Sequence, residues 1–168
     1  ALPAGNYALQ ITMTGVTPQG AAFVRTTEQL IAVATGGIRL SAQPQAAPQD
    51  DVRLRIELPV SGAAATAGRV VRAAAEVWGV DATGTAVPVA WVSGLTAVTR
   101  SQMGGGLSVS LTLDGHSIAL AGAQAPFELR AMRLQDRDNH VPLAVADVLP
   151  LAVRALPTSV HELVDQPT

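Results

Sequence analysis

The sequence predicts an all-β chain whose antiparallel strands form a sandwich. Apolar and polar residues alternate with a period of two along several stretches, which is typical of strands with one face towards a core. Clusters rich in Gly, Pro, Asp and Asn separate these stretches at short intervals, as in antiparallel sandwiches. Of the 168 residues, 48% are apolar but only 3% are aromatic, so Ala, Val and Leu must form thin inner faces.

Residues 1–34 are predicted to be a terminal β-hairpin. Alternation from Tyr7 to Met13 marks the first strand, and a segment that contains Pro18 marks the turn. A lone hairpin is only marginally stable in water. It must therefore pack on the rest of the chain, belong to an upstream or incomplete domain, or pair with another chain. The last alternative makes strand exchange through residues 7–33 an expected mode of association.

Residues 38–153 are predicted to form the sandwich itself. Thr35-Gly36-Gly37 separates it from the hairpin, and the segment from Gln43 to Asp51, rich in Pro, Gln and Ala, is expected to be an exposed loop. Further strands are expected at Arg53–Leu58, Val87–Val92, Leu107–Leu113, Ser117–Ala121, Phe127–Leu134 and Val141–Val153.

Three short polar segments are predicted to turn the chain between these strands. Asp81–Gly84 is typical of a hairpin loop, and Asp136–His140 separates the last two strands. Asp114-Gly115 is the strongest two-residue hairpin signal, and it predicts a tight turn between Leu107–Leu113 and Ser117–Ala121.

The segment Ala63–Trp78 is compatible with two kinds of structure. It is rich in Ala, the best helix former, and Arg72 and Glu76 would make an i,i+4 pair on a helix. As a strand, it would turn alternate residues from Val71 to Val77 inward and the two charged residues outward. The β-rich neighbours on both sides favour the strand.

The tail, residues 155–168, loses the alternation. Ser159 and Glu162 fit a capping box, so either a short helix over Val160–Val164 or a frayed end is expected.

Composition and charge exclude several classes of function. All 11 basic residues are Arg, and without Lys there is no Schiff-base or P-loop lysine. Without Cys there is no thiol nucleophile, thiolate metal site or disulfide. The net charge of −2 gives no electrostatic footprint for nucleic acid. No apolar run reaches the roughly 18–20 residues of a membrane span. We therefore expect neither a nucleic-acid partner nor a membrane span.

Parts of the chain resemble bacterial immunoglobulin-like sandwiches. Gly5–Ile11, with its Gly-x-Tyr pattern, and Gly20–Val33 look like the last two strands of one such module. Ala75–Gly79, Val89–Gly94 and Leu129–Leu143 resemble the C-terminal part of a family of exported proteobacterial proteins. The resemblance implies tandem immunoglobulin-like modules in a periplasmic or secreted protein, and it transfers no catalytic residue.

Two clusters have the residue types of metal ligands. Asp136, Asp138 and Asn139 place hard oxygen atoms in one loop, as Ca²⁺ requires, but the EF-hand pattern is incomplete and Arg137 lies between the acids. The alternative is a solvated turn held by Asx hydrogen bonds. His161–Asp165 resembles a zinc helix but has Asp where the second His belongs, which favours a polar turn. We expect no cofactor, and Ca²⁺ is the alternative.

Trp78 and Trp91 are the only indoles, and they are the candidate ligand-binding residues. Exposed indoles stack on sugar rings or form protein hot spots, whereas buried ones would be the largest core fillers. With so few aromatic residues, use in the core is favoured. Trp78 shares a face with Arg72 and Glu76, which makes it the better candidate for a half-exposed site. The carboxylates of Glu57, Glu76 and Glu128 are expected on solvated faces.

The leading hypothesis is therefore a non-catalytic immunoglobulin-like binding or structural module of an exported bacterial protein. It would recognise a protein or glycan partner through loops or sheet edges. The alternative is a carbohydrate-binding or accessory module of a secreted hydrolase. A third hypothesis, a metal-dependent hydrolase, would use His116, His140 or His161.

Overall fold

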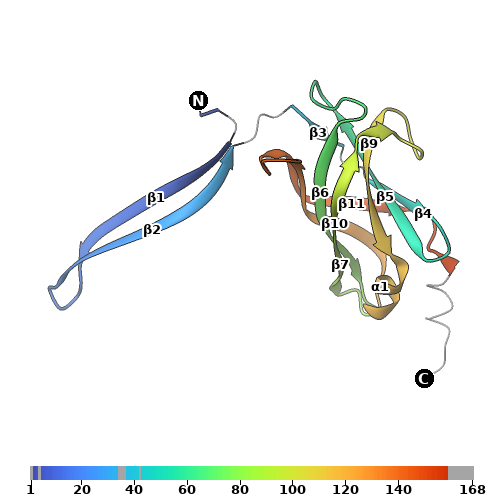
Figure 1. Ribbon diagram of the computed structural model, residues 1–168. Coiled ribbons are helices and arrows are strands. Elements are labelled where there is room, and N and C mark those ends of the chain that lie inside the picture. Colours follow the sequence, from blue (N-terminus) through green and yellow to red (C-terminus); the bar gives the residue numbers. More distant parts are fainter. Residues whose placement is uncertain (1, 4, 34–36, 42, 159–168) are drawn as a thin grey trace.

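The computed structural model describes residues 2–3, 5–33, 37–41 and 43–158 (Figure 1). Within them the chain forms strands and one short helix, as the alternating pattern predicts. No helix in this part of the chain is long and apolar enough to cross a membrane. The expected capping box at Ser159 and the His161–Asp165 cluster lie outside the described residues.

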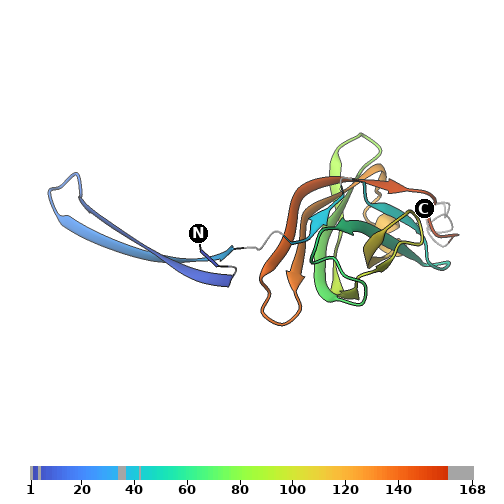
Figure 2. The ribbon, with the colours of Figure 1, turned by 90° about the horizontal axis from the view of Figure 1, so that it is seen from above.

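The first two strands form a separate two-stranded sheet. β1 (Gly5–Val16) pairs with β2 (Ala22–Val33) in antiparallel register along its whole length. The turn between them needs a left-handed residue, which Gly20 supplies with a φ of 84°. In Figures 1 and 2 this hairpin extends away from the other strands.

The remaining strands form a curled sandwich of two layers (Figure 2). One layer contains β6 (Val70–Val80), β7 (Ala86–Ala97), β10 (Gln124–Asp136) and β11 (Pro142–Val153). The other contains β3 (Arg39–Leu40), β4 (Gln45–Pro48), β5 (Arg53–Ser61), β8 (Thr99–Arg100) and β9 (Leu107–Asp114). The end of β11 pairs with β4 in parallel, so the layers join into one order, β7-β6-β10-β11-β4-β5-β9-β8.

The core lies between the layers and consists mainly of aliphatic side chains. β5 contributes Leu54, Ile56 and Leu58, and β6 contributes alternate small residues from Val71 to Val77, all of them buried. The strand interpretation of this segment is therefore confirmed from Val70 onward, and a turn precedes it.

Two local predictions are wrong. Asp114-Gly115 does not form a hairpin, and the expected strand Ser117–Ala121 is instead part of α1 (Gly115–Leu120). The reason is that the Asp114 carboxylate accepts a hydrogen bond from the His116 N–H, 2.9 Å away, and so caps the helix.

The second error concerns the Pro-rich segment Gln43–Asp51. It contains β4, whose residue Ala46 is fully buried. Backbone pairing with β5 and the small side chain of Ala46 allow this segment to enter the core despite its Pro and Gln content.

β10 contains a bulge that turns an extra side chain outward. Its pairing with β6 shifts register between Arg130 and Arg133, where Ala131 adopts a φ of 48°. Because of this extra residue, Leu129 and Met132 both point into the core although three positions separate them.

Candidate functional site

The outer face of the layer β7-β6-β10-β11 carries both indoles. Cross-strand partners share a face of a sheet, so the register defines rows of neighbours. One row consists of Trp91, Glu76, Arg130 and Val148, one residue from each strand. The adjacent row consists of Pro88, Trp78, Glu128 and Pro150. We call the outward residues Glu76, Trp78, Trp91, Leu95, Glu128, Arg130, Val145 and Val148 the aromatic face.

The preference for both indoles in the core is wrong: Trp91 is 55% exposed, and Trp78 is half-buried on the same outer side. The half-exposed position of Trp78 is the one that its shared face with Arg72 and Glu76 predicts. Their neighbours Val92 and Val77 are buried, so strand alternation turns both indoles outward. The thin sandwich is filled by Leu, Val, Ile and Ala, with Phe127 as its buried aromatic residue. Bulky indoles are not needed inside.

Trp78 is held in place by charged side chains on both sides. Its indole Nε1 donates a hydrogen bond to Glu76 Oε2 over 2.9 Å. The Arg130 guanidinium lies over the ring, 3.9 Å from its centroid, in a cation–π contact. Arg130 in turn donates to Glu128 Oε1. Trp78 is thus a fixed part of the surface rather than a mobile side chain.

Trp91 lacks this support, and its indole ring is exposed to solvent. It lies on β7, which is an edge of the layer, and Leu95 on the same strand is 54% exposed. Val145 and Val148 are exposed at the other side of the face. An exposed indole beside aliphatic side chains and fixed charges is the composition of a protein-binding hot spot, and it also suits a sugar ring.

Sequence reasoning places Glu76 and Glu128 at outward strand positions, but it missed the apolar members of this face and Arg130. Leu95 could have been found, because the period of two places residues 91, 93 and 95 on one side of a strand. Arg130 and Val148 could not, since their position beside Glu76 depends on the register of β10 and on its bulge. Local patterns carry no information about such long-range pairing.

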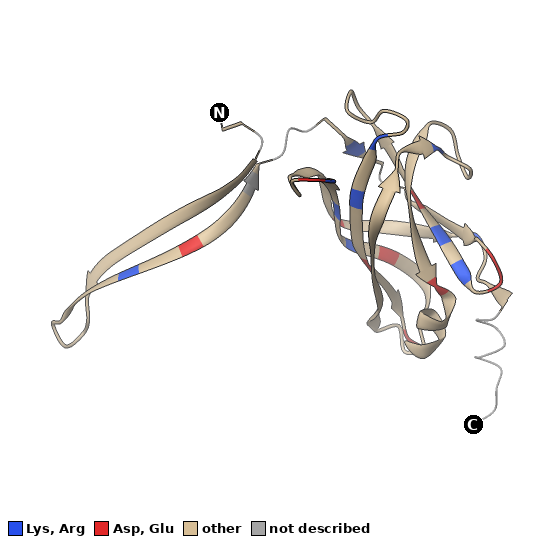
Figure 3. Ribbon diagram, viewed as in Figure 1, with Lys and Arg blue, Asp and Glu red and all other residues tan. Residues whose placement is uncertain are grey.

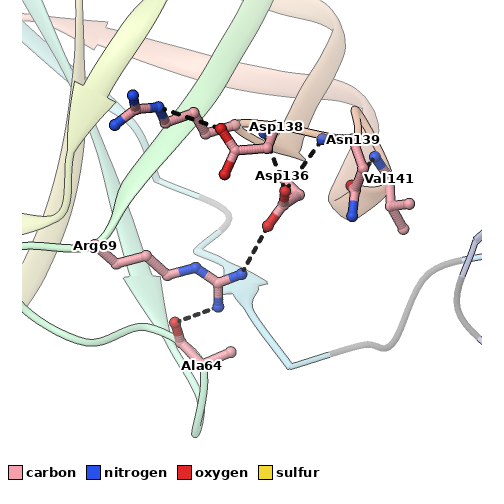
Figure 4. Close-up of polar contacts among 7 residues, drawn as sticks. Ala64, Arg69, Asp136, Asp138, Asn139 and Val141 are labelled. Carbon is pink, nitrogen blue, oxygen red and sulfur yellow. Dashed lines mark hydrogen bonds and ion pairs between the residues drawn. The ribbon is translucent and has the colours of Figure 1, made fainter.

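The loop that holds the predicted calcium ligands is a tightly hydrogen-bonded turn (Figure 4). Asp136 Oδ1 accepts from the N–H groups of Asp138 and Asn139, at 3.1 and 3.3 Å. Asn139 Oδ1 accepts from the N–H of Val141 at 2.9 Å. Arg69 approaches Asp136 Oδ2 to 3.5 Å. The two backbone N–H groups, with Arg69 adding to them, lower the pKa of the Asp136 carboxyl.

These contacts fit the Asx-turn alternative. Within the described residues, no three His, Cys, Asp or Glu side chains gather as a metal site would require. The calcium site at Asp136, Asp138 and Asn139 stays a prediction, and Arg69 is the cation found beside it.

The histidines of the hydrolase hypothesis lie apart in the chain's fold. His116 Nδ1 is 3.0 Å from Asp114 Oδ1 at the start of α1, whereas His140 is in the loop before β11 with a φ of 60°. His161 lies outside the described residues. The arrangement offers no nucleophile with a base and an orienting group among the side chains described.

Comparisons with known proteins agree with the sandwich architecture. The family model described as the third Ig-like domain of conditioned medium factor matches residues 72–168. A protein named conditioned medium factor, from Dictyostelium discoideum, is 30% identical over 143 residues, which cover 83% of this chain and 20% of that protein. The chain thus spans about a fifth of this relative. No solved structure matches the chain. The proteobacterial source that the resemblance implies has no support from this relative and stays a prediction.

Proposed function

The chain belongs to the family described as the third immunoglobulin-like domain of conditioned medium factor, and on that premise we propose that it is a non-catalytic module that binds a protein partner through the aromatic face. Export is part of the proposal. The name of the Dictyostelium relative refers to conditioned medium, which supports an exported protein.

The observation that carries the proposal is the exposure of Trp91. A surface Trp removed from water at an interface contributes more than most contacts, because its large flat ring buries much apolar area with few rotatable bonds. Leu95 lies four residues along the same strand, on the same face, and enlarges the apolar area. The Glu76–Trp78–Arg130–Glu128 network would form a charged and rigid border to this area.

A glycan-binding module is the second candidate, and it depends on the same residue. An exposed indole with a carboxylate as its cross-strand neighbour, Glu76, can stack on a sugar ring while the carboxylate accepts from hydroxyl groups. Ser93 and Arg133 are also exposed on this outer face, in the row that ends at Val145. The protein partner is favoured because Leu95, Val145 and Val148 add exposed aliphatic area, which an interface with a protein buries and a sugar does not need.

The test compares Trp91→Ala with Leu120→Ala on the immobilised chain. Both variants remove an exposed apolar side chain, but Leu120 lies at the end of α1 and outside the aromatic face. The probes are the proteins of the source culture medium and a glycan array. We expect a protein that the wild type and Leu120→Ala retain and that Trp91→Ala binds about tenfold more weakly or not at all.

Two results would decide against this proposal. If the wild type binds glycans and Trp91→Ala does not, the chain is a sugar-binding module and the proposal of a protein partner is wrong. A protein ligand that Trp91→Ala and the wild type bind equally well would remove the aromatic face from the account.

A further inference from the structure

β7 is a free edge of the sandwich, and most of this edge is unprotected. Natural sheets usually blunt their edges with charged residues, Pro, bulges or short strands, because an open edge pairs with other strands. The 12 residues of β7 include no charged residue, so the strand is tan throughout in Figure 3. Pro88 and a register shift beside it blunt the first part of β7 only. By contrast, the edge of β11 before its short pairing with β4 carries Asp147 and two Pro residues.

Alternate residues of β7 direct their backbone N–H and C=O groups towards the free edge. Val98, directly after β7, donates from its N–H to the Arg69 carbonyl oxygen and accepts from the Gly68 N–H, both at 2.8 Å. Gly68 and Arg69 lead into β6, so the backbone groups of Val98 face β6. Successive residues of a strand turn these groups to opposite edges, so the odd-numbered residues before Val98 face the free edge. These residues include Trp91, Ser93 and Leu95.

The open part of this edge is centred on Ser93. Towards the start of β7, the regular pairing with β6 ends at Ala90, where the register shifts. Towards its end, Thr96 Oγ1 accepts a hydrogen bond from the Ser110 N–H at 3.3 Å, so β9 lies against the edge from Thr96 onward. Ser93 lies midway between these two limits. It is small and exposed, so another strand can approach it closely.

An edge with this symmetry fits a second copy of itself. In antiparallel pairing about a twofold axis at Ser93, the two Ser93 residues face each other, and Trp91 faces Leu95 of the second copy. Directly opposite residues contact each other, so each indole, 55% exposed, would pack on a Leu side chain that is 54% exposed. We infer that two copies of this chain pair through β7 in this way, with the same surface on both sides of the contact.

The charges near the edge are compatible with this pairing. Arg72 and Glu76 on β6 are the charged cross-strand neighbours of Leu95 and Trp91. The row that contains Glu76 and Trp91 of one copy would continue through Leu95 to Arg72 of the second copy. Charges of opposite sign therefore lie at the two ends of each row, and no like charges approach each other across the axis.

The contact is small, so we expect a weak dimer. The edge from Pro88 to Thr96 is about 30 Å long at about 3.3 Å per residue, and a sheet layer is about 10 Å thick. With the exposed parts of both indoles, two copies would bury about 850 Å² in total. This area lies below the roughly 1,200 Å² of standard interfaces and in the range of transient contacts. The dissociation constant should be on the order of 100 µM.

This inference rests on the proposed function, because it uses Trp91 and Leu95 of the aromatic face, and it names a partner for that face. Sedimentation equilibrium of the 168-residue chain tests it at concentrations from about 10 µM to 1 mM. The wild type should change from monomer to dimer over this range. Ser93→Lys should weaken the dimer at least about tenfold, because two like charges would lie directly opposite each other at the axis.

Gln10→Lys is the matched control, since it adds the same charge at an exposed position of β1 in the separate hairpin. It should dimerise like the wild type. A chain that stays monomeric up to about 1 mM would overturn the inference. So would a dimer that Gln10→Lys weakens and Ser93→Lys preserves. Either result leaves the proposed function to be decided separately, by whether the medium protein needs Trp91 for binding.

The twofold register can be tested by crosslinking, because the chain contains no Cys. Ser93→Cys would place two thiols directly opposite each other, with Cβ atoms about 5 Å apart. Ala86→Cys, at the exposed start of the same strand, would leave its two thiols far apart at opposite ends of the contact. A short thiol-specific crosslinker should therefore link Ser93→Cys at least about tenfold faster than Ala86→Cys. Equal rates would exclude this register and overturn the inference.

Discussion

Glu57 is a buried carboxylate, contrary to its predicted place on a solvated face. It is 2% exposed although it lies on the outer side of β5, because the loop after β8 folds over it. Ser101 Oγ donates to its Oε2, and the Gln102 N–H donates to its Oε1 at 3.0 Å. The Met103 N–H adds a longer contact of 3.3 Å. The carboxylate thus fixes the loop together with Arg55, which donates to Gln102 Oε1 at 2.6 Å, and Arg154, which donates to the Met103 carbonyl oxygen.

Replacement of Glu57 should therefore lower stability. Glu57→Ala leaves the hydroxyl and two N–H groups without an acceptor, which should cost about 2–4 kcal/mol in the free energy of unfolding measured with urea. Glu57→Gln keeps one acceptor oxygen and should lose less. Asp51→Ala, at an exposed carboxylate on the same layer, is the control and should stay within about 0.5 kcal/mol of the wild type. Equal stability of Glu57→Ala and Asp51→Ala would show that the loop does not depend on the carboxylate.

The sequence indicates the direction of a strand residue better than its exposure. Alternation correctly turns Glu57, Glu76 and Trp78 away from the core. It does not show that a loop 44 residues later covers Glu57. It also does not show that Arg130 stacks on Trp78, because that contact depends on the pairing of β6 with β10. The roles that residues acquire from contacts with distant segments cannot be predicted from local sequence patterns.

At the scale of an element, the bulge in β10 determines the geometry of the aromatic face. A regular strand would turn Met132 outward, because it lies three residues after the inward Leu129. The bulge at Ala131 allows Met132 to point into the core like Leu129, and it leaves Arg130 on the outer side beside Glu76. The left-handed φ of 48° at Ala131 is unfavourable for a residue with a Cβ.

Replacement of Ala131 by glycine should relieve the unfavourable backbone conformation at this position. Ala131→Gly is expected to raise the free energy of unfolding by about 0.5–1 kcal/mol. The steric strain that it removes from the folded state exceeds the cost of the larger conformational entropy that glycine gives the unfolded chain. Ala146→Gly, on the neighbouring strand β11 where the pairing with β10 is regular, is the control and should lower it by a similar amount, because a regular strand gains nothing from glycine. Urea unfolding of both variants measures the difference. Equal losses would mean that Ala131 is not strained.

Elements with strong alternation are predicted well, and elements defined by a cap or by pairing are not. β5, β6 and β9 follow from alternate apolar residues that need one buried face. α1 was missed because Asp-Gly serves a hairpin turn and a helix N-terminus equally well, and the capping bond to His116 decides between them. β4 was missed because its few residues become a strand only through pairing with β5 and β11.

At the scale of the whole molecule, two apolar surfaces have different origins. The aromatic face belongs to a complete sandwich with its own core, so its exposed side chains are not required for folding. The β1–β2 hairpin is a separate two-stranded sheet with exposed apolar residues on both sides, among them Met13 and Leu30. A lone hairpin is only marginally stable in water, so the aromatic face is the surface suited to reversible recognition.

The placement of both indoles outside the core is the claim on which the proposed function depends. Acrylamide quenching of two single-tryptophan variants measures it directly: Trp78→Phe leaves Trp91, and Trp91→Phe leaves Trp78. We predict that Trp91 emits at long wavelength and is quenched strongly, because it is 55% exposed. Trp78, half-buried beneath Arg130, should be quenched less. Short-wavelength emission and weak quenching in both variants would place the indoles in the core and contradict the account.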